Sequence, residues 1–120
     1  MTDKTKKILG WVLAGLVAFV FIGSGGFKIS GGNAEMVKGL GGATNLLILG
    51  SLEVIIAILF LYPRTGVIGA LLGIAYMGGA MAVHLVSGQS IMLLVVIEVL
   101  IWITSAVRFP ELVERLRGAK

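Results

Sequence analysis

The chain has 120 residues, of which 58% are hydrophobic and 13% are charged. Soluble domains are usually about 45–50% apolar and about 25% charged, so this composition argues against a soluble domain and for a membrane protein. The net charge of +4 comes without a basic patch interleaved with aromatic residues, and no nucleic-acid partner is expected. Cysteine is absent, which excludes disulfides and thiolate chemistry by this chain alone.

Four apolar stretches long enough to cross a bilayer follow one another along the chain. A transmembrane helix needs about 20 mostly apolar residues, and such stretches lie at residues 8–29, 44–62, 66–86 and 90–107. The predicted fold is therefore all-α: one domain, residues 1–120, forming a four-transmembrane-helix antiparallel bundle. The first stretch follows a basic start, as in a signal peptide, but no A-x-A site follows it, so we expect a retained helix.

Two short helices are expected outside the spans. The glycine-rich loop at residues 30–45 contains Asn33, which is a suitable N-cap for a helix over residues 34–40. After the fourth span, Arg108-Phe-Pro begins a charged tail in which residues 111–117 are expected to form a helix on the membrane surface.

The basic residues predict the orientation. Eight of the ten Lys and Arg fall on the side of the two termini and the 63–65 turn, and only Lys28 and Lys38 fall on the other side. Cytoplasmic segments carry the excess of Lys and Arg, so both termini are expected in the cytoplasm. Trp11 and Tyr62 fall at span ends, where aromatic side chains favour the membrane–water interface.

Four ionisable residues lie within the spans or at their ends, where a charge is costly. Glu53 lies eight residues below Asn45, and Glu98 lies eight residues below Ser90, which places both about 12 Å deep at 1.5 Å per residue. Lys28 and His84 lie near the outer helix ends. The expected arrangement has two carboxylates at one level and two basic groups above them.

Helical periodicity aligns these residues with small and aromatic side chains. At about 100° per residue, Glu98 shares a stripe with Trp102, and Tyr76 borders the stripe of His84. The functional interpretation is an outward-facing polar pocket that binds a ligand through these residues. The structural alternative is an ion-pair network that holds helices together, and near a helix end Lys28 can also extend to the headgroups.

Other chemistries have little support in the sequence. His84 is the only histidine, so two histidines from one chain cannot ligate a haem, and no metal site is expected. No P-loop, dinucleotide fingerprint or catalytic-triad order is present. The glycines of the third span (Gly66, Gly69, Gly73, Gly78 and Gly79) are expected to allow close helix approach.

Three segments together resemble the DoxX-like membrane proteins. They are Gly23-Ser-Gly-Gly-Phe-Lys28-Ile, Glu53 followed by an apolar run and Pro63-Arg64, and the segment from Tyr76-Met-Gly-Gly through His84-Leu-Val-Ser-Gly. The resemblance covers nearly the whole chain. It implies a multi-pass protein of the bacterial inner membrane and carries over Lys28, Glu53, Tyr76 and His84 as site residues; Glu98 is less clearly part of the pattern.

Two functions follow as hypotheses, and the sequence does not decide whether the chain is an enzyme. The resemblance implies a quinone- or lipid-interacting subunit of a membrane redox system, with quinone as the candidate cofactor, the bilayer as a partner and other redox subunits as candidate partners. The alternative is a non-catalytic binding or assembly protein that holds a hydrophobic amine, a lipid or a helix of another protein. A small proton-coupled exporter ranks last, because such exporters carry a glutamate in the first helix and this chain has none there.

Overall fold

A computed structural model describes residues 2–118, in which the regular secondary structure is helical and no strand occurs. Six helices follow in chain order: α1 (Asp3–Ile29), α2 (Ala34–Gly39), α3 (Ala43–Leu61), α4 (Gly66–Val86), α5 (Met92–Arg108) and α6 (Pro110–Leu116). The prediction of an all-helical chain is confirmed. The third expected span agrees with α4 at both ends, and the other three agree within two residues except at the start of α1.

Helix α1 begins five residues before the expected position. The Thr2 hydroxyl oxygen accepts a hydrogen bond from the Thr5 backbone N–H at 3.1 Å and caps the helix. Asp3 lies in the first turn, where its charge is favourable toward the helix dipole. The expected start at residue 8 followed the onset of hydrophobicity, whereas the helix starts at the cap. Lys4, Lys6 and Lys7 are therefore helical.

Three helices are long and apolar enough to cross a membrane, namely α1, α3 and α4. Helix α5 has 17 residues, and together with α6 it forms a pair bent by 109° that supplies a fourth candidate span. The apolar residues on the outside of the molecule agree with lipid as the solvent: Phe19, Val86 and Leu93 are 75%, 89% and 71% exposed. These findings identify a multi-pass membrane protein.

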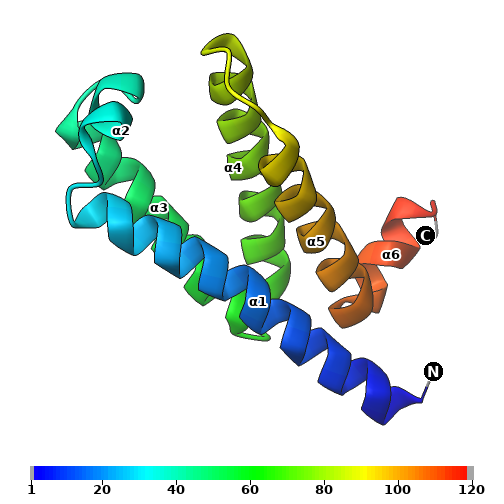
Figure 1. Cartoon of the computed structure of the whole chain (residues 1–120). Helices are drawn as coiled ribbons and strands as arrows, with labels where there is room; N and C mark the ends of the chain where they lie inside the picture. The colour runs from blue at the N-terminus through cyan, green and yellow to red at the C-terminus, as the bar shows by residue number, and fades with distance from the viewer. Residues whose placement is uncertain (1, 119–120) are drawn as a thin grey trace.

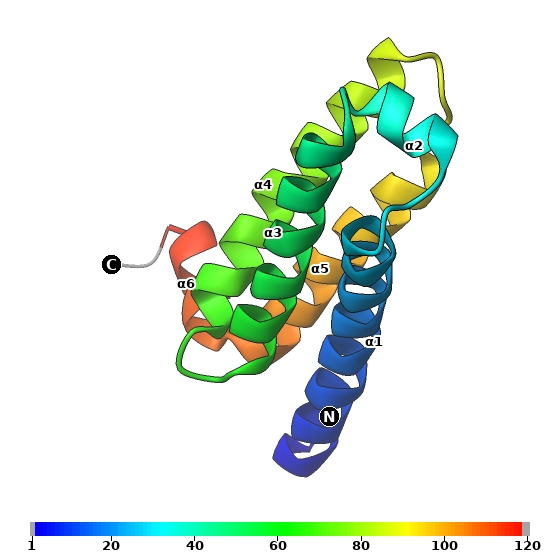
Figure 2. The same ribbon diagram turned by 90° about the vertical axis from the view of Figure 1, so that its left-hand side faces the viewer.

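The four long helices form a ring in which α1 and α4 each pack against both α3 and α5. The start of α1, the 62–65 turn and α6 lie toward one end of the molecule, which is called the α6 end (Figure 1). The opposite end carries α2 and the 87–91 loop and is here the α2 end; Figure 2 shows the same arrangement from the side. The core between the helices contains Ala14, Phe21, Phe60, Ala70 and Ile101.

Among the glycines of α4, only those in the first part of the helix permit close packing. A Cβ atom added to Gly69 would collide with the backbone of Phe60, and one added to Gly66 would collide with the ring of Phe109. Gly73 has ordinary van der Waals surroundings, and Gly78 and Gly79 face open space. The expected close-packed ridge is therefore limited to Gly66 and Gly69, next to the turn that joins α3 to α4.

Both predicted short helices are present. The Asn33 side chain caps α2 by accepting a hydrogen bond from the Met36 N–H at 2.8 Å. Pro110 occupies the first turn of α6, where a missing N–H costs nothing. Phe109 at the bend is buried and packs edge-on against Phe60, with ring centroids 6.5 Å apart. This contact holds the junction of α5 and α6 against α3.

Candidate functional site

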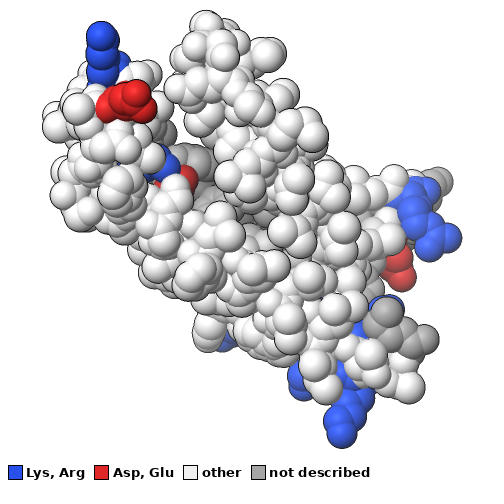
Figure 3. Space-filling view, in the orientation of Figure 1, with Lys and Arg blue, Asp and Glu red and all other residues white. Residues whose placement is uncertain are grey.

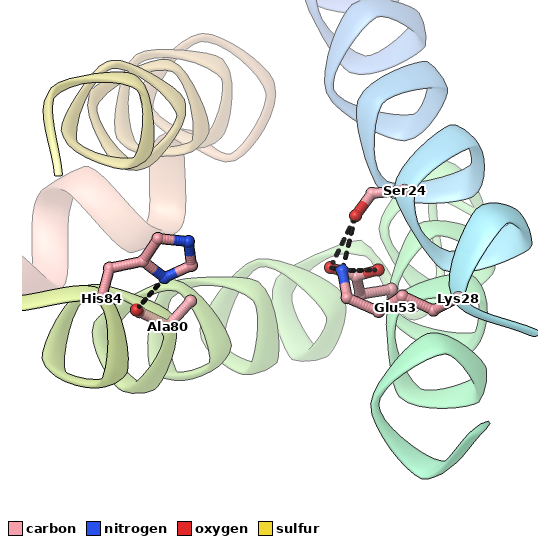
Figure 4. A network of polar contacts seen from close by, with 5 residues as sticks. All are labelled: Ser24, Lys28, Glu53, Ala80 and His84. Carbon is pink, nitrogen blue, oxygen red and sulfur yellow. Dashed lines mark hydrogen bonds and ion pairs between the residues drawn. The ribbon is translucent and has the colours of Figure 1, made fainter. Parts of the chain in front are cut away.

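Three polar side chains meet between α1 and α3 (Figure 4). Lys28 Nζ lies 3.1 Å from both carboxylate oxygens of Glu53 and 2.7 Å from the hydroxyl oxygen of Ser24. The Ser24 hydroxyl in turn donates to Glu53 Oε1 at 3.2 Å. The side chains of Lys28 and Glu53 are only 11% and 7% exposed. The structure thus brings together two of the predicted site residues, and it adds Ser24.

The local sequence explains how the three side chains meet. Ser24 and Lys28 are four residues apart on α1 and therefore share one face of the helix. A Cβ atom on Gly25 would lie 2.7 Å from the Gly50 carbonyl oxygen of α3, so the two helices touch backbone to backbone beside the ion pair. Larger residues at these positions would hold α1 and α3 too far apart for this contact.

The ammonium group of Lys28 is saturated by this arrangement. An ammonium group has three N–H donors, and three oxygen atoms surround Lys28 Nζ. The carboxylate of Glu53 retains acceptor capacity, because each of its oxygens can accept about two hydrogen bonds and Oε2 receives only one from Lys28. The network is neutral in total charge. A further group can join it only by donating a hydrogen bond to Glu53.

Tyr76 connects the network to α4. Its hydroxyl lies close enough to Glu53 for the carboxylate to act on it both through its charge and as a hydrogen-bond acceptor, although no close and well-aligned hydrogen bond joins the two among residues 2–118. The Tyr76 ring packs on Phe21, with ring centroids 6.1 Å apart and planes inclined by 55°. Since Phe21 and Met77 are buried, aromatic and apolar side chains lie beside the ion pair on the side facing the core.

The surface is hollowed near the α2 end, between the part formed by α1 to α3 and the part formed by α4 and α5 (Figure 3). One basic and one acidic side chain appear side by side inside this hollow. This pair corresponds to Lys28 and Glu53, which form the salt bridge found among residues 2–118. The hollow gives a ligand a route from the α2 end toward a polar group within the apolar bundle.

His84 does not join the three-residue network. Its Nδ1 lies 2.8 Å from the carbonyl oxygen of Ala80 on its own helix, and Figure 4 shows the ring set apart from Ser24, Lys28 and Glu53. When Nδ1 carries the proton and donates to Ala80, Nε2 is left as an acceptor. His84 is partly exposed near the α2 end of α4.

Glu98 and Trp102 lie on α5, on the opposite side of the helix ring from α3. Glu98 Oε1 is buried and has no hydrogen-bond partner among residues 2–118. Trp102 is 41% exposed. Among residues 2–118, no hydrogen bond joins Glu98 or Trp102 to Lys28 or Glu53. The two carboxylates thus lie on helices that are not neighbours in the ring, and their shared ligand-binding role stays a prediction.

Arg108 has a larger part in the structure than the positive-inside pattern indicated. Its two terminal nitrogens donate to the carbonyl oxygens of Phe60 and Leu61 at 2.6 and 3.2 Å. Its guanidinium group also lies 4.9–5.1 Å from the ring centroids of Trp11, Phe60 and Phe109. These contacts link α5 with the last turn of α3 and with α1. The only signal in the sequence was that Arg108 directly precedes Phe-Pro, where a helix is expected to end.

No cluster of three or more His, Cys, Asp or Glu that would hold a metal ion occurs among residues 2–118. The polar groups that the structure does gather are a hydroxyl, an ammonium and a carboxylate. They are suited to hydrogen bonding and to ion pairing.

No family model, curated protein or solved structure matches this chain. The DoxX-like resemblance of the three sequence segments therefore stays an expectation that rests on those segments.

Proposed function

We propose that this protein is a DoxX-like multi-pass protein of the bacterial inner membrane that binds a quinone or another amphipathic lipid in the hollow at its α2 end. In this proposal α1, α3, α4 and α5 span the membrane as an antiparallel bundle with both termini in the cytoplasm. The α2 end then faces outward. The resemblance implies that the protein serves a membrane redox system as a subunit that holds the lipid.

The buried Ser24–Lys28–Glu53 network inside the hollow is the observation that supports the proposal most. A buried salt bridge is weak evidence for stability by itself, because desolvation of the two charges offsets much of their attraction. Ionisable groups in a membrane are by default candidates for function. Here they stand next to aromatic side chains and to a route from the membrane surface.

The chemistry of the network favours a ligand with a hydrogen-bond donor. The Lys28 ammonium is saturated, whereas Glu53 Oε2 can accept one more hydrogen bond. The hydroxyl of a quinol, the reduced form of a quinone, meets this requirement, whereas the oxidised form offers only acceptors. The isoprenoid tail fits the lipid phase. The rings of Phe21 and Tyr76 supply apolar surface for the head group.

Mass spectrometry of small molecules extracted from the gently purified protein tests this proposal. We expect a quinone or quinol at near-stoichiometric amount in the wild-type protein. Glu53→Gln keeps the size of the side chain but removes its charge, and it should lower the bound amount at least tenfold. Because the change also breaks the pair with Lys28, circular dichroism of the same sample checks that the variant is folded. Glu111→Gln on the exposed face of α6 is the matched control. Extraction of only bulk phospholipid from the wild-type protein would contradict the proposal.

The alternative function is a non-catalytic binding or assembly partner, and one observation favours it. Glu98 Oε1 is a buried oxygen without a hydrogen-bond partner among residues 2–118, and it lies on a different helix from the network. A hydrophobic amine, or a donor on a helix of another protein, would satisfy this carboxylate. Co-purification of a second membrane protein that is lost in Glu98→Gln, together with absence of quinone, would favour this alternative.

A further inference from the structure

A shallow apolar groove lies at the α6 end, away from the hollow at the α2 end. It is lined by Trp11 of α1, by Ile58 and Leu61 of α3 and by Tyr62 and Pro63 of the turn that follows, and its volume is about 310 Å³. Trp11 and Tyr62 are 45% and 56% exposed. A groove that is open along one side and lined only by apolar and aromatic side chains suits a flexible hydrocarbon chain.

Cationic residues occur in both segments that line this groove. On α1, Lys4, Lys7 and Trp11 follow one another at spacings of three and four residues, so they share one face of the helix. This spacing has structural meaning because α1 is helical from Asp3 onward. On the other wall, Arg64 is exposed and lies two residues after Tyr62. Lys6 lies on a different face of α1.

The combination identifies one class of occupant. A neutral lipid would gain nothing from three cations, and a small soluble anion would gain nothing from the apolar groove. An anionic phospholipid uses both features. Trp and Tyr prefer the level of the headgroups, so the lining residues lie at the depth at which a lipid passes from phosphate to acyl chain.

We propose that this groove binds an acyl chain of an anionic phospholipid, with the lipid headgroup held between Arg64 and the stripe of Lys4 and Lys7. The site is separate from the Ser24–Lys28–Glu53 network. A cation near a membrane surface contributes about 1 kcal/mol to attraction of anionic lipid, which corresponds to about a fivefold change in association for each charge.

Quenching of Trp11 fluorescence by brominated lipids tests the site in the full-length protein. The Trp102→Phe background leaves Trp11 as the single tryptophan, because the chain has only two. In vesicles with equal fractions of brominated lipid, brominated phosphatidylglycerol should quench Trp11 more strongly than brominated phosphatidylcholine. High salt should reduce this difference, because it screens exposed charges, whereas inorganic phosphate at the same ionic strength should have no further effect.

The variants distinguish a defined site from general surface charge. The double variant Lys4→Gln/Lys7→Gln should lower the preference for the anionic lipid by an order of magnitude or more, and Arg64→Gln by about fivefold. Lys6→Gln, which removes a charge on another face of α1, should leave the preference nearly unchanged. Equal quenching by the two lipids in the wild-type protein, or a loss in Lys6→Gln as large as that in Lys7→Gln, would overturn the proposal.

Discussion

Gly25 of α1 and Gly50 of α3 are in reciprocal backbone contact. A Cβ atom on either glycine would lie 2.7 Å from the carbonyl oxygen of the other. Gly25 directly follows Ser24, and Gly50 is three residues from Glu53. The close approach of the two backbones thus determines whether the side chains of the polar network reach one another.

Gly25→Ala should destabilise the protein by about 1–3 kcal/mol, the usual cost of inserting an atom into a well-packed contact. Gly26→Ala is the matched control, because a Cβ at Gly26 meets nothing within 4 Å. In the interior of a helix, alanine is about 1 kcal/mol more favourable than glycine, so Gly26→Ala should be neutral or stabilising. Thermal unfolding in detergent, followed by circular dichroism, measures both. A similar effect of the two changes would contradict the role of the Gly25–Gly50 contact.

Removing one partner of the Lys28–Glu53 pair should cost more than removing both. Lys28→Met leaves Glu53 buried without its cation, and the loss of one partner from a buried pair usually costs about 3–5 kcal/mol. The double variant Lys28→Met/Glu53→Met should recover at least half of the lost stability. The same unfolding assay measures this recovery. If the double variant is as unstable as the sum of the single variants, the pair does not act as a unit.

Arg108→Lys should destabilise the α6 end of the molecule although the charge is kept. The planar guanidinium of Arg108 donates to two carbonyl oxygens and stacks on aromatic rings at once. The compact ammonium of a lysine cannot do both. Loss of hydrogen bonds to a charged group predicts a cost of about 1.5–3 kcal/mol. Arg117→Lys, at an exposed position, is the control and should be neutral. The measurement is the midpoint of unfolding, and equal midpoints for the two variants would refute this role of Arg108.

Both termini should lie in the cytoplasm, because eight Lys and Arg fall on their side of the spans and two on the other. A reporter that is active only in the periplasm should be inactive when fused after residue 120. The same reporter inserted in the 87–91 loop should be active. Activity of the C-terminal fusion would reverse the orientation and place the hollow on the cytoplasmic side.

The helices could be predicted from the sequence because their signals are local. Apolar runs of membrane-crossing length, the Asn33 cap and Pro110 depend on residues close together in the chain, and each marks an element that the structure contains. The start of α1 was wrong by five residues, since hydrophobicity marks entry into lipid whereas Thr2 marks the first hydrogen-bonded turn.

The candidate site could be predicted only in part. The free-energy cost of placing a charge in a membrane singled out Lys28 and Glu53, and the two residues form a salt bridge in the structure. Depth along each helix also grouped Glu98 and His84 with them, but depth carries no information about which helices are neighbours. Glu98 lies on α5, which does not adjoin α3 in the ring, and the Nδ1 of His84 bonds to its own helix. Ser24 was missed because a serine among glycines has no signal of its own.

The sequence by itself determined that the chain is helical and apolar enough to cross a membrane, because both properties follow from the composition of each segment. Only the tertiary structure decided which polar residues meet. The pairing of Lys28 with Glu53 depends on the contact of Gly25 with Gly50, and the capping of α3 by Arg108 bridges 48 residues of chain. Such contacts depend on how whole helices pack, and helix packing in lipid is governed by the shape of both partners at once.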